Sequence, residues 1–233
     1  MPIFLNRLFD LRFYKPSFSH GIHALRRITT SGGRVPLPTL QAMRSAFPET
    51  DIYLMFGLTE AFRSTFLDPD QVDIRPESIG KAIPDVEIMV LDEQGEECPP
   101  DQPGELVHRG GVIASGYWNA PEKTAQRFRP WIDASGNTET VVYSGDLVRR
   151  DAEGYLYFIG RRDNMIKTSG HRVSPEEIEQ VAETLPGVGA AIVFSRPHDV
   201  LGEEIIMVCT PNESGAIDEI ELRAAMRERL AAY

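Results

Sequence analysis

The stretch ALRRITTSGGRVPLPTLQAMRSAFPETDIYLMFGLTE, residues 24–60, decides the expected fold. Its first part, 24–30, is a short strand candidate that ends in a Ser-Gly-Gly turn. Pro38 stands where a first helical turn tolerates proline, and apolar residues recur at helical spacing over 40–47. The continuous apolar run at 52–56 is typical of a parallel strand buried on both faces. The stretch therefore predicts a strand, a helix and a second, parallel strand.

The two loops that follow these strands are expected to be neighbours. A crossover of this kind places both strand ends at one edge of the sheet. The loop SGG at 31–33 and the loop GLTE at 57–60 then share that edge. Because open α/β sheets bind ligands outside the carboxyl ends of their strands, this edge is the expected binding edge.

Beyond this unit the sequence changes its character twice. From about 79 to 159 it consists of short strand candidates separated by turns such as DEQG at 92–95 and AEG at 152–154, which predicts an all-β subdomain. After Gly160 comes a charged segment, and SPEE at 174–177 then supplies a capping box with proline at the first helical position. A separate helical region is therefore expected from there onward.

The C-terminal part mixes helices and strands. Two strand candidates, 190–194 and 205–209, lie between the helix after Ser174 and a final helix that begins near Asp218. Residues 164–233 are therefore expected to form a compact α+β unit with apolar stripes facing inward. Its expected core consists of Ile178, Val181, Leu185, Ile192, Ile206, Met226 and Leu230.

The predicted fold class is mixed, with α/β and α+β parts. Residues 1–75 are expected to be the end of a parallel α/β subdomain, 76–162 a β-rich subdomain, and 163–233 a connection followed by an incomplete small α+β domain. A chain of 233 residues is long enough for two domains with real cores.

Composition excludes several classes of partner. The chain has 24 Lys and Arg against 35 Asp and Glu, and its net charge of −11 repels phosphate backbones and anionic lipid heads. No segment approaches membrane-spanning length, and polar residues interrupt the apolar N-terminus. Cys98 and Cys209 are far apart and lack metal-type spacing. We expect a cytoplasmic protein without nucleic-acid binding or membrane insertion.

Four patterns in a fixed order carry chemistry. They are SGGR at 31–34, FGLTE at 56–60, YSGD at 143–146, and GRRD at 160–163 continuing to KTSGHR at 167–172. Together with GEL at 104–106 and GYWNAPE at 116–122, they make the chain similar to the adenylate-forming (AMP-dependent) ligase superfamily, of the acyl-CoA synthetase type. The resemblance covers nearly the whole chain from about residue 24, and it implies a distorted barrel for the β-rich subdomain.

The first pair of patterns agrees with the roles that the resemblance implies. Glycines let a backbone approach a flat purine closely, and Phe56 can stack on that ring. The Thr59 hydroxyl can donate to the α-phosphate, and Glu60 can hold Mg²⁺ as a hard oxygen ligand. The alternative for FGLTE alone is a glycine turn followed by a capping threonine and a solvated glutamate.

Asp146 and Arg161 are expected at the ribose and nucleotide. An ionised carboxylate at Asp146 can accept hydrogen bonds from both ribose hydroxyls, and the resemblance implies this role. The alternative is a turn residue that bonds its own backbone. Arg161 matches a nucleotide-contacting arginine, and its alternative is an exposed salt-bridge partner.

The GRRD segment and the loop after it are expected to serve a domain rotation. The resemblance makes Asp163 the hinge about which a small C-terminal domain swings, while a plain linker is the alternative. Ser169, Gly170 and Arg172 resemble the loop that approaches nucleotide and pantetheine in the second pose, and a β-turn with a surface arginine is their alternative. His171 has no Ser or Cys partner at a recognisable spacing and is assigned no role.

The expected site residues fall into four groups. Thr59 and Glu60 are the expected catalytic pair, Glu60 is the expected metal ligand, and Asp163 is the expected hinge. The expected nucleotide and cofactor contacts are Gly33, Arg34, Met55, Phe56, Gly57, Leu58, Thr59, Asp146, Arg161, Ser169, Gly170 and Arg172. The acyl substrate is not readable, and Arg63 is either a sensor of a polar substrate group or an exposed arginine.

The resemblance implies an ATP-dependent ligase that converts a small carboxylic acid to an acyl-adenylate and then to a thioester, with coenzyme A as acceptor and Mg²⁺ as metal. Two family elements are not recognisable: the upstream Ser/Thr/Gly-rich phosphate loop with its lysine, and the C-terminal catalytic lysine. We therefore expect a fragment that is inactive alone. The alternatives are a non-catalytic nucleotide-binding or interaction module, and an amino-acid adenylation domain that serves a carrier-protein thiol.

Overall fold

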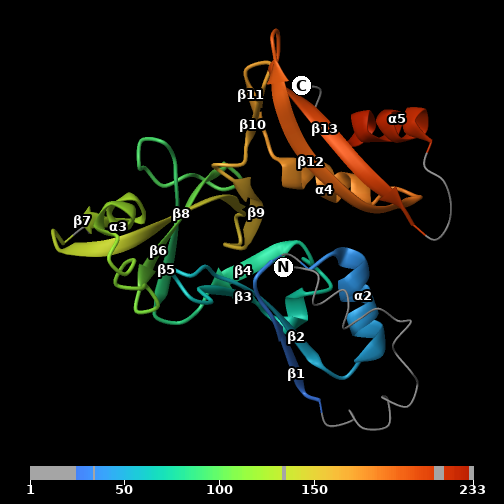
Figure 1. The fold of residues 1–233 in the computed structure, drawn as a ribbon. Coiled ribbons are helices and arrows are strands. Elements are labelled where there is room, and N and C mark those ends of the chain that lie inside the picture. The colour runs from blue at the N-terminus through green and yellow to red at the C-terminus, as the bar shows by residue number, and fades with distance from the viewer. Residues whose placement is uncertain (1–24, 34, 133–134, 213–217, 231–233) are drawn as a thin grey trace. The chain divides into compact units, whose positions relative to one another are not determined.

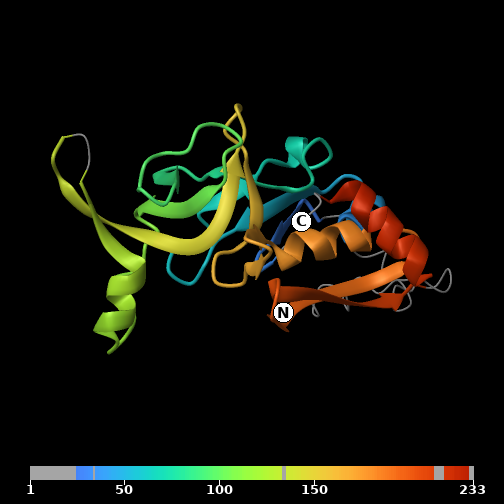
Figure 2. The ribbon, with the colours of Figure 1, turned by 90° about the horizontal axis from the view of Figure 1, so that it is seen from above.

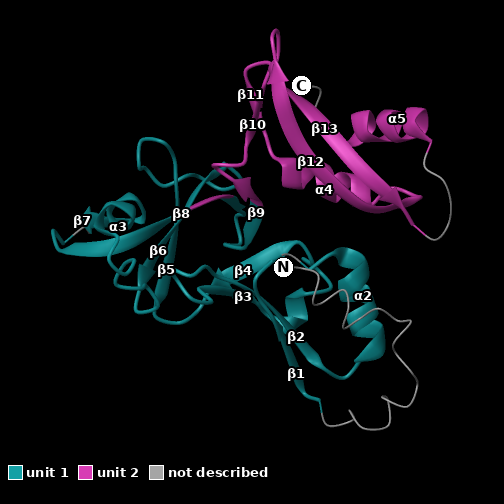
Figure 3. Ribbon diagram, viewed as in Figure 1, with its two compact units in different colours: residues 1–144, 148–158 teal, residues 145–147, 159–233 magenta. Residues whose placement is uncertain are grey.

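A computed structural model describes residues 25–33, 35–132, 135–212 and 218–230 (Figure 1). The chain divides into two compact units (Figure 3). The first comprises residues 1–144 and 148–158, and the second comprises 145–147 and 159–233. Within the described ranges, none of the helices combines the length and apolar character needed to cross a bilayer.

The N-terminal elements form the predicted strand, helix and strand. They are β1 (Arg27–Thr30), α2 (Leu37–Ala46) and β2 (Asp51–Phe56). β1 and β2 are parallel, with Thr30 opposite Leu54, so both strands end at the same edge. Leu40 and Met43 of α2 are buried against Ile52 and Leu54. The helix thus covers one face of the strand pair, as the 3.6-residue spacing of its apolar side chains requires.

The expectation that the run at 52–56 is buried on both faces is wrong for three of its five residues. Ile52 and Leu54 are buried, but Tyr53, Met55 and Phe56 are only half-buried. The second neighbour of β2 is antiparallel, namely β3 (Thr65–Leu67), and the Tyr53 ring lies 6.2 Å from that of Phe66. Successive side chains of a strand point to opposite faces, and α2 covers only one of them.

The chain then continues into the β-rich part of the same sheet. Its elements are η2 (Pro69–Gln71), β4 (Ser78–Ala82), β5 (Val86–Leu91), β6 (Gly104–Gly110), α3 (Pro121–Arg127), β7 (Phe128–Ile132), β8 (Thr138–Arg150) and β9 (Leu156–Arg161). The strand order is β1-β2-β3-β4-β9-β8-β6-β5, and β7 pairs with β8. The mixed α/β class is as predicted, and one sheet joins the α/β and β-rich parts.

Both faces of the β5–β6 pair are apolar. Val90 and Leu106 are opposite each other in register and belong to one buried cluster, which also contains Leu156. Met89 and Val107, one residue along each strand, belong to a second cluster. Alternation with a period of two therefore supplies two cores from one pair of strands.

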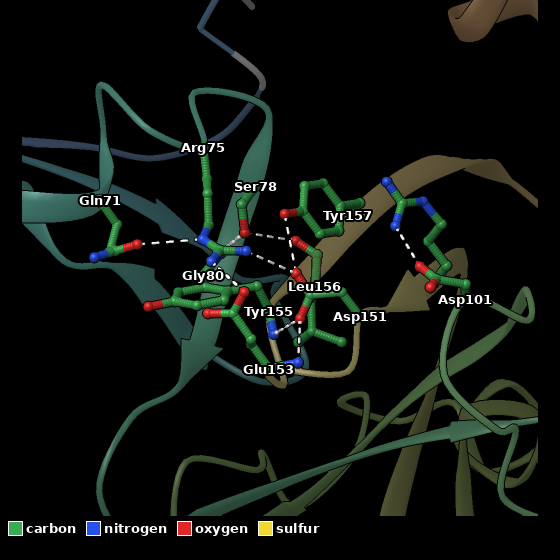
Figure 4. A network of polar contacts seen from close by, with 11 residues as sticks. Gln71, Arg75, Ser78, Gly80, Asp101, Asp151, Glu153, Tyr155, Leu156 and Tyr157 are labelled. Carbon is green, nitrogen blue, oxygen red and sulfur yellow. Dashed lines mark hydrogen bonds and ion pairs between the residues drawn. The ribbon is translucent and has the colours of Figure 1, made fainter.

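A polar network joins η2 and β4 to the turn before β9 (Figure 4). Arg75 donates to Asp151 at 3.0 Å and to Glu153 at 2.6 Å, and its guanidinium lies 4.3 Å from the Tyr155 ring. The Asp151 carboxylate also accepts the backbone N–H of Tyr155 at 2.8 Å. One arginine thus fixes a turn more than seventy residues away in the sequence.

The second unit has its own small sheet and core. Its elements are β10 (Ile166–Thr168), β11 (His171–Val173), α4 (Pro175–Glu183), β12 (Val188–His198), β13 (Gly202–Pro211) and α5 (Glu219–Arg229), and its strand order is β11-β10-β13-β12. The predicted N-caps are confirmed, because Ser174 accepts the N–H of Glu177 and Asp218 accepts that of Glu221. Figure 2 shows α4 and α5 on one face of β12 and β13.

The predicted core of this unit is correct for the helices and wrong for the strands. Ile178, Leu185 and Met226 are buried, with Val181 and Leu230 packed against them. Ile192, however, is 65% exposed, because Ala191 and Val193 are the residues of β12 that face the helices. Ile206 lies opposite the exposed Phe194 in register, and its neighbours Ile205 and Met207 pack on the core instead. Apolar residues on both faces hide which face of a strand points inward.

His108 of β6 is a buried titratable group inside this sheet. It is fully buried, and neither ring nitrogen has a hydrogen-bond partner among the described residues. Burial lowers the pKa of His108 from 6.5 to about 4, because the charged imidazolium is poorly solvated there. The folded chain therefore holds this histidine neutral, whereas the unfolded chain binds a proton near pH 6.5.

This difference predicts a specific pH dependence of stability. The contribution is complete above pH 6.5 and is lost as the pH falls toward 4, so unfolding free energy should decrease by about 2 kcal/mol between pH 7 and pH 5. Urea unfolding followed by tryptophan fluorescence reports the first unit, because both tryptophans lie in it. His108→Leu should remove this part of the slope, while His171→Gln, at an exposed histidine, should keep it. An unchanged slope in His108→Leu would contradict the assignment.

Candidate functional site

The loop at the carboxyl end of β2 holds the predicted catalytic pair. Leu58 and Ala61 exchange two backbone hydrogen bonds, of 3.1 and 3.3 Å, which close a tight turn around Thr59 and Glu60. Thr59 is exposed and Glu60 is half-buried. The turn therefore presents a hydroxyl and a carboxylate side by side in sequence at the edge where a ligand was expected.

Gly57 is required by the chain's own backbone. A Cβ atom at this position would lie 2.2 Å from the backbone nitrogen of Arg63 and 2.7 Å from its Cα. Neither atom can move away cheaply, so only glycine fits. The sequence alone explains this glycine by a close approach to a purine, but in the structure the backbone at Arg63 lies close to it. Gly33 differs from it, because a Cβ there meets nothing within 4 Å.

Phe56 and Met55 are engaged by neighbouring side chains. The Phe56 ring lies 6.2 Å from that of Phe158 in β9 and packs on the core cluster of Val90 and Leu106. The Met55 sulfur accepts a weak hydrogen bond from Arg63 at 3.9 Å. Side chains of the sheet therefore pack against Phe56.

Arg63 is half-buried and not an exposed surface arginine. Its backbone has a φ of +46°, and its Nε atom is buried without a hydrogen-bond partner among the described residues. A non-glycine residue in the left-handed region is uncommon. Arg34, the remaining residue of the first pattern, lies outside the described residues.

Asp146 and Arg161 form an ion pair inside the second unit. The Arg161 Nη1 atom donates to Asp146 Oδ1 at 2.8 Å, and the Asp146 side chain is only 5% exposed. The alternative that Asp146 is a turn residue is wrong, because the residue lies within β8, which continues past Gly145 although that glycine has a φ of +75°. The two predicted nucleotide contacts are thus paired with each other in the tertiary structure, which neither sequence pattern predicted.

Arg161 also reaches the predicted hinge residue. Its Nε atom donates to Asp163 Oδ1 at 3.1 Å, and Asp163 is exposed. The hydrogen bond to Asp163 is the main reason that the pKa of Arg161 lies above its ordinary value; burial opposes this, and the charge of Asp146 adds to it. One guanidinium therefore links a buried carboxylate to an exposed one.

The last group of predicted contacts forms a hairpin tip. Ser169 and Gly170 are the two residues between β10 and β11, with φ angles of +49° and +83°, as a two-residue hairpin turn requires. The backbone N–H of Ser169 donates to the carbonyl of Leu201 at 2.8 Å. Arg172 follows in β11 and is exposed. The alternative of a β-turn with a surface arginine describes this local geometry well.

Sequence reasoning missed one residue that touches the candidate metal ligand. The Tyr117 hydroxyl donates a hydrogen bond to the Glu60 carboxylate. Tyr117 belongs to the pattern GYWNAPE at 116–122, which contributes to the resemblance but received no role. The position of Tyr117 in a pattern shared with known enzymes could have marked it as a site residue. Its contact with Glu60 could not be predicted from the sequence spacing.

Comparisons with known proteins agree with this arrangement. A family model described as AMP-binding enzyme matches residues 1–118, and one described as AMP-binding enzyme C-terminal domain matches 177–233. The chain therefore belongs to the AMP-binding enzyme family, within the AMP-dependent ligase superfamily.

Named relatives include a CoA ligase and a subunit of surfactin synthase. The chain is 33% identical over 200 residues to the 3-hydroxybenzoate–CoA ligase of Aromatoleum sp. (strain CIB), covering 85% of this chain and 36% of that protein. It is 34% identical to the surfactin synthase subunit 2 of Bacillus subtilis (strain 168), covering 89% of this chain and 6% of that protein. The chain thus spans well under half of the length of these relatives.

Solved structures share the fold. ATP-bound MatB from Rhodopseudomonas palustris is 28% identical, with a TM-score of 0.79 over 99% of this chain and 43% of that chain. The O-succinylbenzoate coenzyme A synthetase (MenE) from Bacillus subtilis, in complex with ATP and magnesium ion, is 26% identical, with a TM-score of 0.77 over 99% of this chain and 44% of that chain. Related folds therefore bind ATP, in one case with magnesium.

The Asp146–Arg161 pair predicts an effect on stability. Arg161→Met would leave the buried Asp146 carboxylate without this cation, and the free energy of unfolding should fall by about 2 kcal/mol. Arg223→Met, which breaks an ion pair whose partners are 70% and 76% exposed, should change it by less than about 0.5 kcal/mol. Urea unfolding followed by circular dichroism measures both. Equal decreases in the free energy of unfolding for the two variants would show that burial of Asp146 does not set the contribution of its ion pair to stability.

Proposed function

We propose that the chain is the part of an ATP-dependent carboxylate-activating ligase that binds adenine, ribose and magnesium. The observation that carries this proposal is the turn after β2, where Thr59 and Glu60 follow each other at the binding edge of the sheet. Membership of the AMP-binding enzyme family supports it. The activity of the whole protein, its substrates and its partners are all part of the proposal.

The proposed reaction has two steps. An oxygen of the substrate carboxylate bonds to the α-phosphorus of ATP, and the bond to the leaving pyrophosphate breaks. A thiol then loses its proton to solvent, its sulfur attacks the acyl carbon, the thioester forms, and AMP leaves with the electron pair of the acyl–oxygen bond. Both steps place negative charge near the α-phosphate, so donors and a cation held there stabilise the transition state.

Six predicted site residues, at 55–60 in the first unit, have proposed tasks. Thr59 donates its exposed hydroxyl to the α-phosphate, and Phe56 with Gly57, Leu58 and Met55 forms the wall beside adenine. Glu60 holds Mg²⁺, which supplies positive charge to the phosphates. Mg²⁺ is usually bound by one or two carboxylates together with substrate phosphates, so the single carboxylate of Glu60 is compatible with a magnesium site. Among the described residues, no group of three or more His, Cys, Asp or Glu side chains is placed to hold a metal ion.

Residues of the second unit are proposed to hold the ribose and to move. Asp146 accepts the ribose hydroxyls while its ion pair with Arg161 orients its carboxylate. Asp163 is the proposed hinge, and its exposed ion pair with Arg161 costs little to break. Ser169, Gly170 and Arg172 are proposed to approach nucleotide and pantetheine after the rotation. The division at 1–75, 76–162 and 163–233 remains a proposal.

Coenzyme A is the proposed thiol. Several named relatives are CoA ligases, including those for 3-hydroxybenzoate and 2-succinylbenzoate. The similarity to surfactin synthase subunit 2 supports the second candidate, an amino-acid adenylation domain that serves a carrier-protein thiol. Transfer of the acyl group to free coenzyme A or to a purified carrier protein by the full-length protein distinguishes the two.

The ribose assignment predicts a loss of nucleotide affinity. Asp146→Ala removes a charged acceptor, and the dissociation constant for ATP should rise about 10-fold or more, because such a hydrogen bond contributes about 1.5 to 3 kcal/mol. Asp163→Ala removes the exposed partner of Arg161. Because exposed ion pairs contribute little, it should leave the dissociation constant for ATP within about twofold. Isothermal calorimetry on the 233-residue chain measures both, with circular dichroism as the check of folding. Unchanged ATP affinity in a folded Asp146→Ala chain would refute the assignment.

A further inference from the structure

The hydrogen bond from Tyr117 to Glu60 joins two segments that are 57 residues apart in the sequence. Glu60 follows β2, and Tyr117 lies in the loop before α3, both within the first unit. The proposed function uses only the carboxylate. What Tyr117 does for that carboxylate depends on how firmly its hydroxyl is held.

The backbone around both residues is already joined. The N–H of Ala114 donates to the backbone carbonyl of Glu60 at 2.8 Å, and Ala61 forms an antiparallel bridge with Ile113. The base of the Glu60 side chain is therefore fixed against the same loop that carries Tyr117. Only the three side-chain torsions of Glu60 remain to be set.

Tyr117 is held at its ring and at its backbone. Its ring meets that of Phe128 edge-on, with centroids 5.6 Å apart and an interplanar angle of 86°. Its backbone N–H donates to the Thr124 hydroxyl oxygen at 2.9 Å, and that hydroxyl in turn donates to the carbonyl of Ala120 at 2.9 Å. The first turn of α3 thus anchors the tyrosine.

Gly116 makes this anchoring possible. Its φ of +127° lies in a region that side chains avoid, and a Cβ atom there would lie 2.7 Å from Thr124 Cγ2. The loop can therefore approach α3 closely only with glycine at this position. The result is a preset direction for the Tyr117 side chain toward Glu60.

We propose that Tyr117 is a positioning residue that holds the Glu60 carboxylate in one orientation for a divalent cation bound with ATP. The inference rests on the proposed role of Glu60 as the magnesium ligand. A carboxylate that is oriented before the metal arrives loses less side-chain freedom on binding. Partners that orient a ligating group in this way contribute about 10-fold or more to metal affinity.

The test compares ATP binding with and without Mg²⁺ in the 233-residue chain. Calorimetric dissociation constants for ATP in excess Mg²⁺ and in EDTA give the gain due to the metal. Tyr117→Phe keeps the ring on Phe128 but removes the hydroxyl, and it should reduce this gain about 10-fold while the constant in EDTA stays within about twofold. Trp118→Phe, at a neighbouring residue that is 97% exposed, should leave both constants unchanged.

Glu60→Gln separates this inference from the proposed function. It should abolish the metal-dependent gain, and adding Tyr117→Phe to it should cause no further loss, because both changes act through one carboxylate. A normal gain in Tyr117→Phe beside a lost gain in Glu60→Gln would overturn the role of Tyr117 alone. A normal gain in Glu60→Gln, or no gain in the unaltered chain, would overturn the magnesium assignment and the inference with it. Equal losses with and without Mg²⁺ in Tyr117→Phe would identify a merely structural tyrosine.

Discussion

The antiparallel pairing of β4 with β9 is the constraint on which the first unit depends. Gly80 pairs with Leu156 of β9, and on its other side it comes so close to β3 that a Cβ atom would lie 1.8 Å from the carbonyl oxygen of Phe66. Its φ of +81° belongs to the left-handed region, so glycine is required on both grounds. Because β4 fits between β3 and β9, the sheet continues from the strand–helix–strand unit into the β-rich part. The Phe158 ring in β9 then lies beside that of Phe56 in β2.

Arg75 secures the same junction from outside. Its bonds to Asp151 and Glu153 and its stacking on Tyr155 hold the turn before β9 against η2 (Figure 4). The planar guanidinium of Arg75 carries donors in fixed directions, so it can bond both carboxylates while it lies over the Tyr155 ring. The junction therefore combines close backbone packing inside with a polar clamp at the surface. Elements needed for the candidate site on β2 are positioned by residues that have no part in its chemistry.

The chain carries a net charge of −11, yet its candidate site is proposed to bind a polyphosphate. Within the second unit, Arg161 is shared between Asp146 and Asp163. Within the first unit, the Glu60 carboxylate accepts a hydrogen bond from an uncharged donor, Tyr117. In the proposed function, a metal ion bound with the nucleotide would add positive charge at the site. Local donors decide which anion binds, whereas the overall charge excludes long polyanions.

The sequence by itself determined whatever depends on neighbours along the chain. Helical spacing and the caps Ser174 and Asp218 fixed two helices, the run at 52–56 fixed a strand, and four ordered patterns indicated the family. These signals are local, because a cap or a periodicity acts within a few residues. The fold class and the family could therefore be predicted, and the roles of the candidate site residues stay predictions.

Only the tertiary structure decided which groups meet. It turned Ile192 outward, placed Asp146 inside β8 and paired it with Arg161. It also brought Tyr117 to Glu60 across 57 residues of sequence. A strand with apolar residues on both faces has no readable orientation, and a contact between distant loops follows from the sheet order and close glycine packing. These are global properties, and no short pattern encodes them.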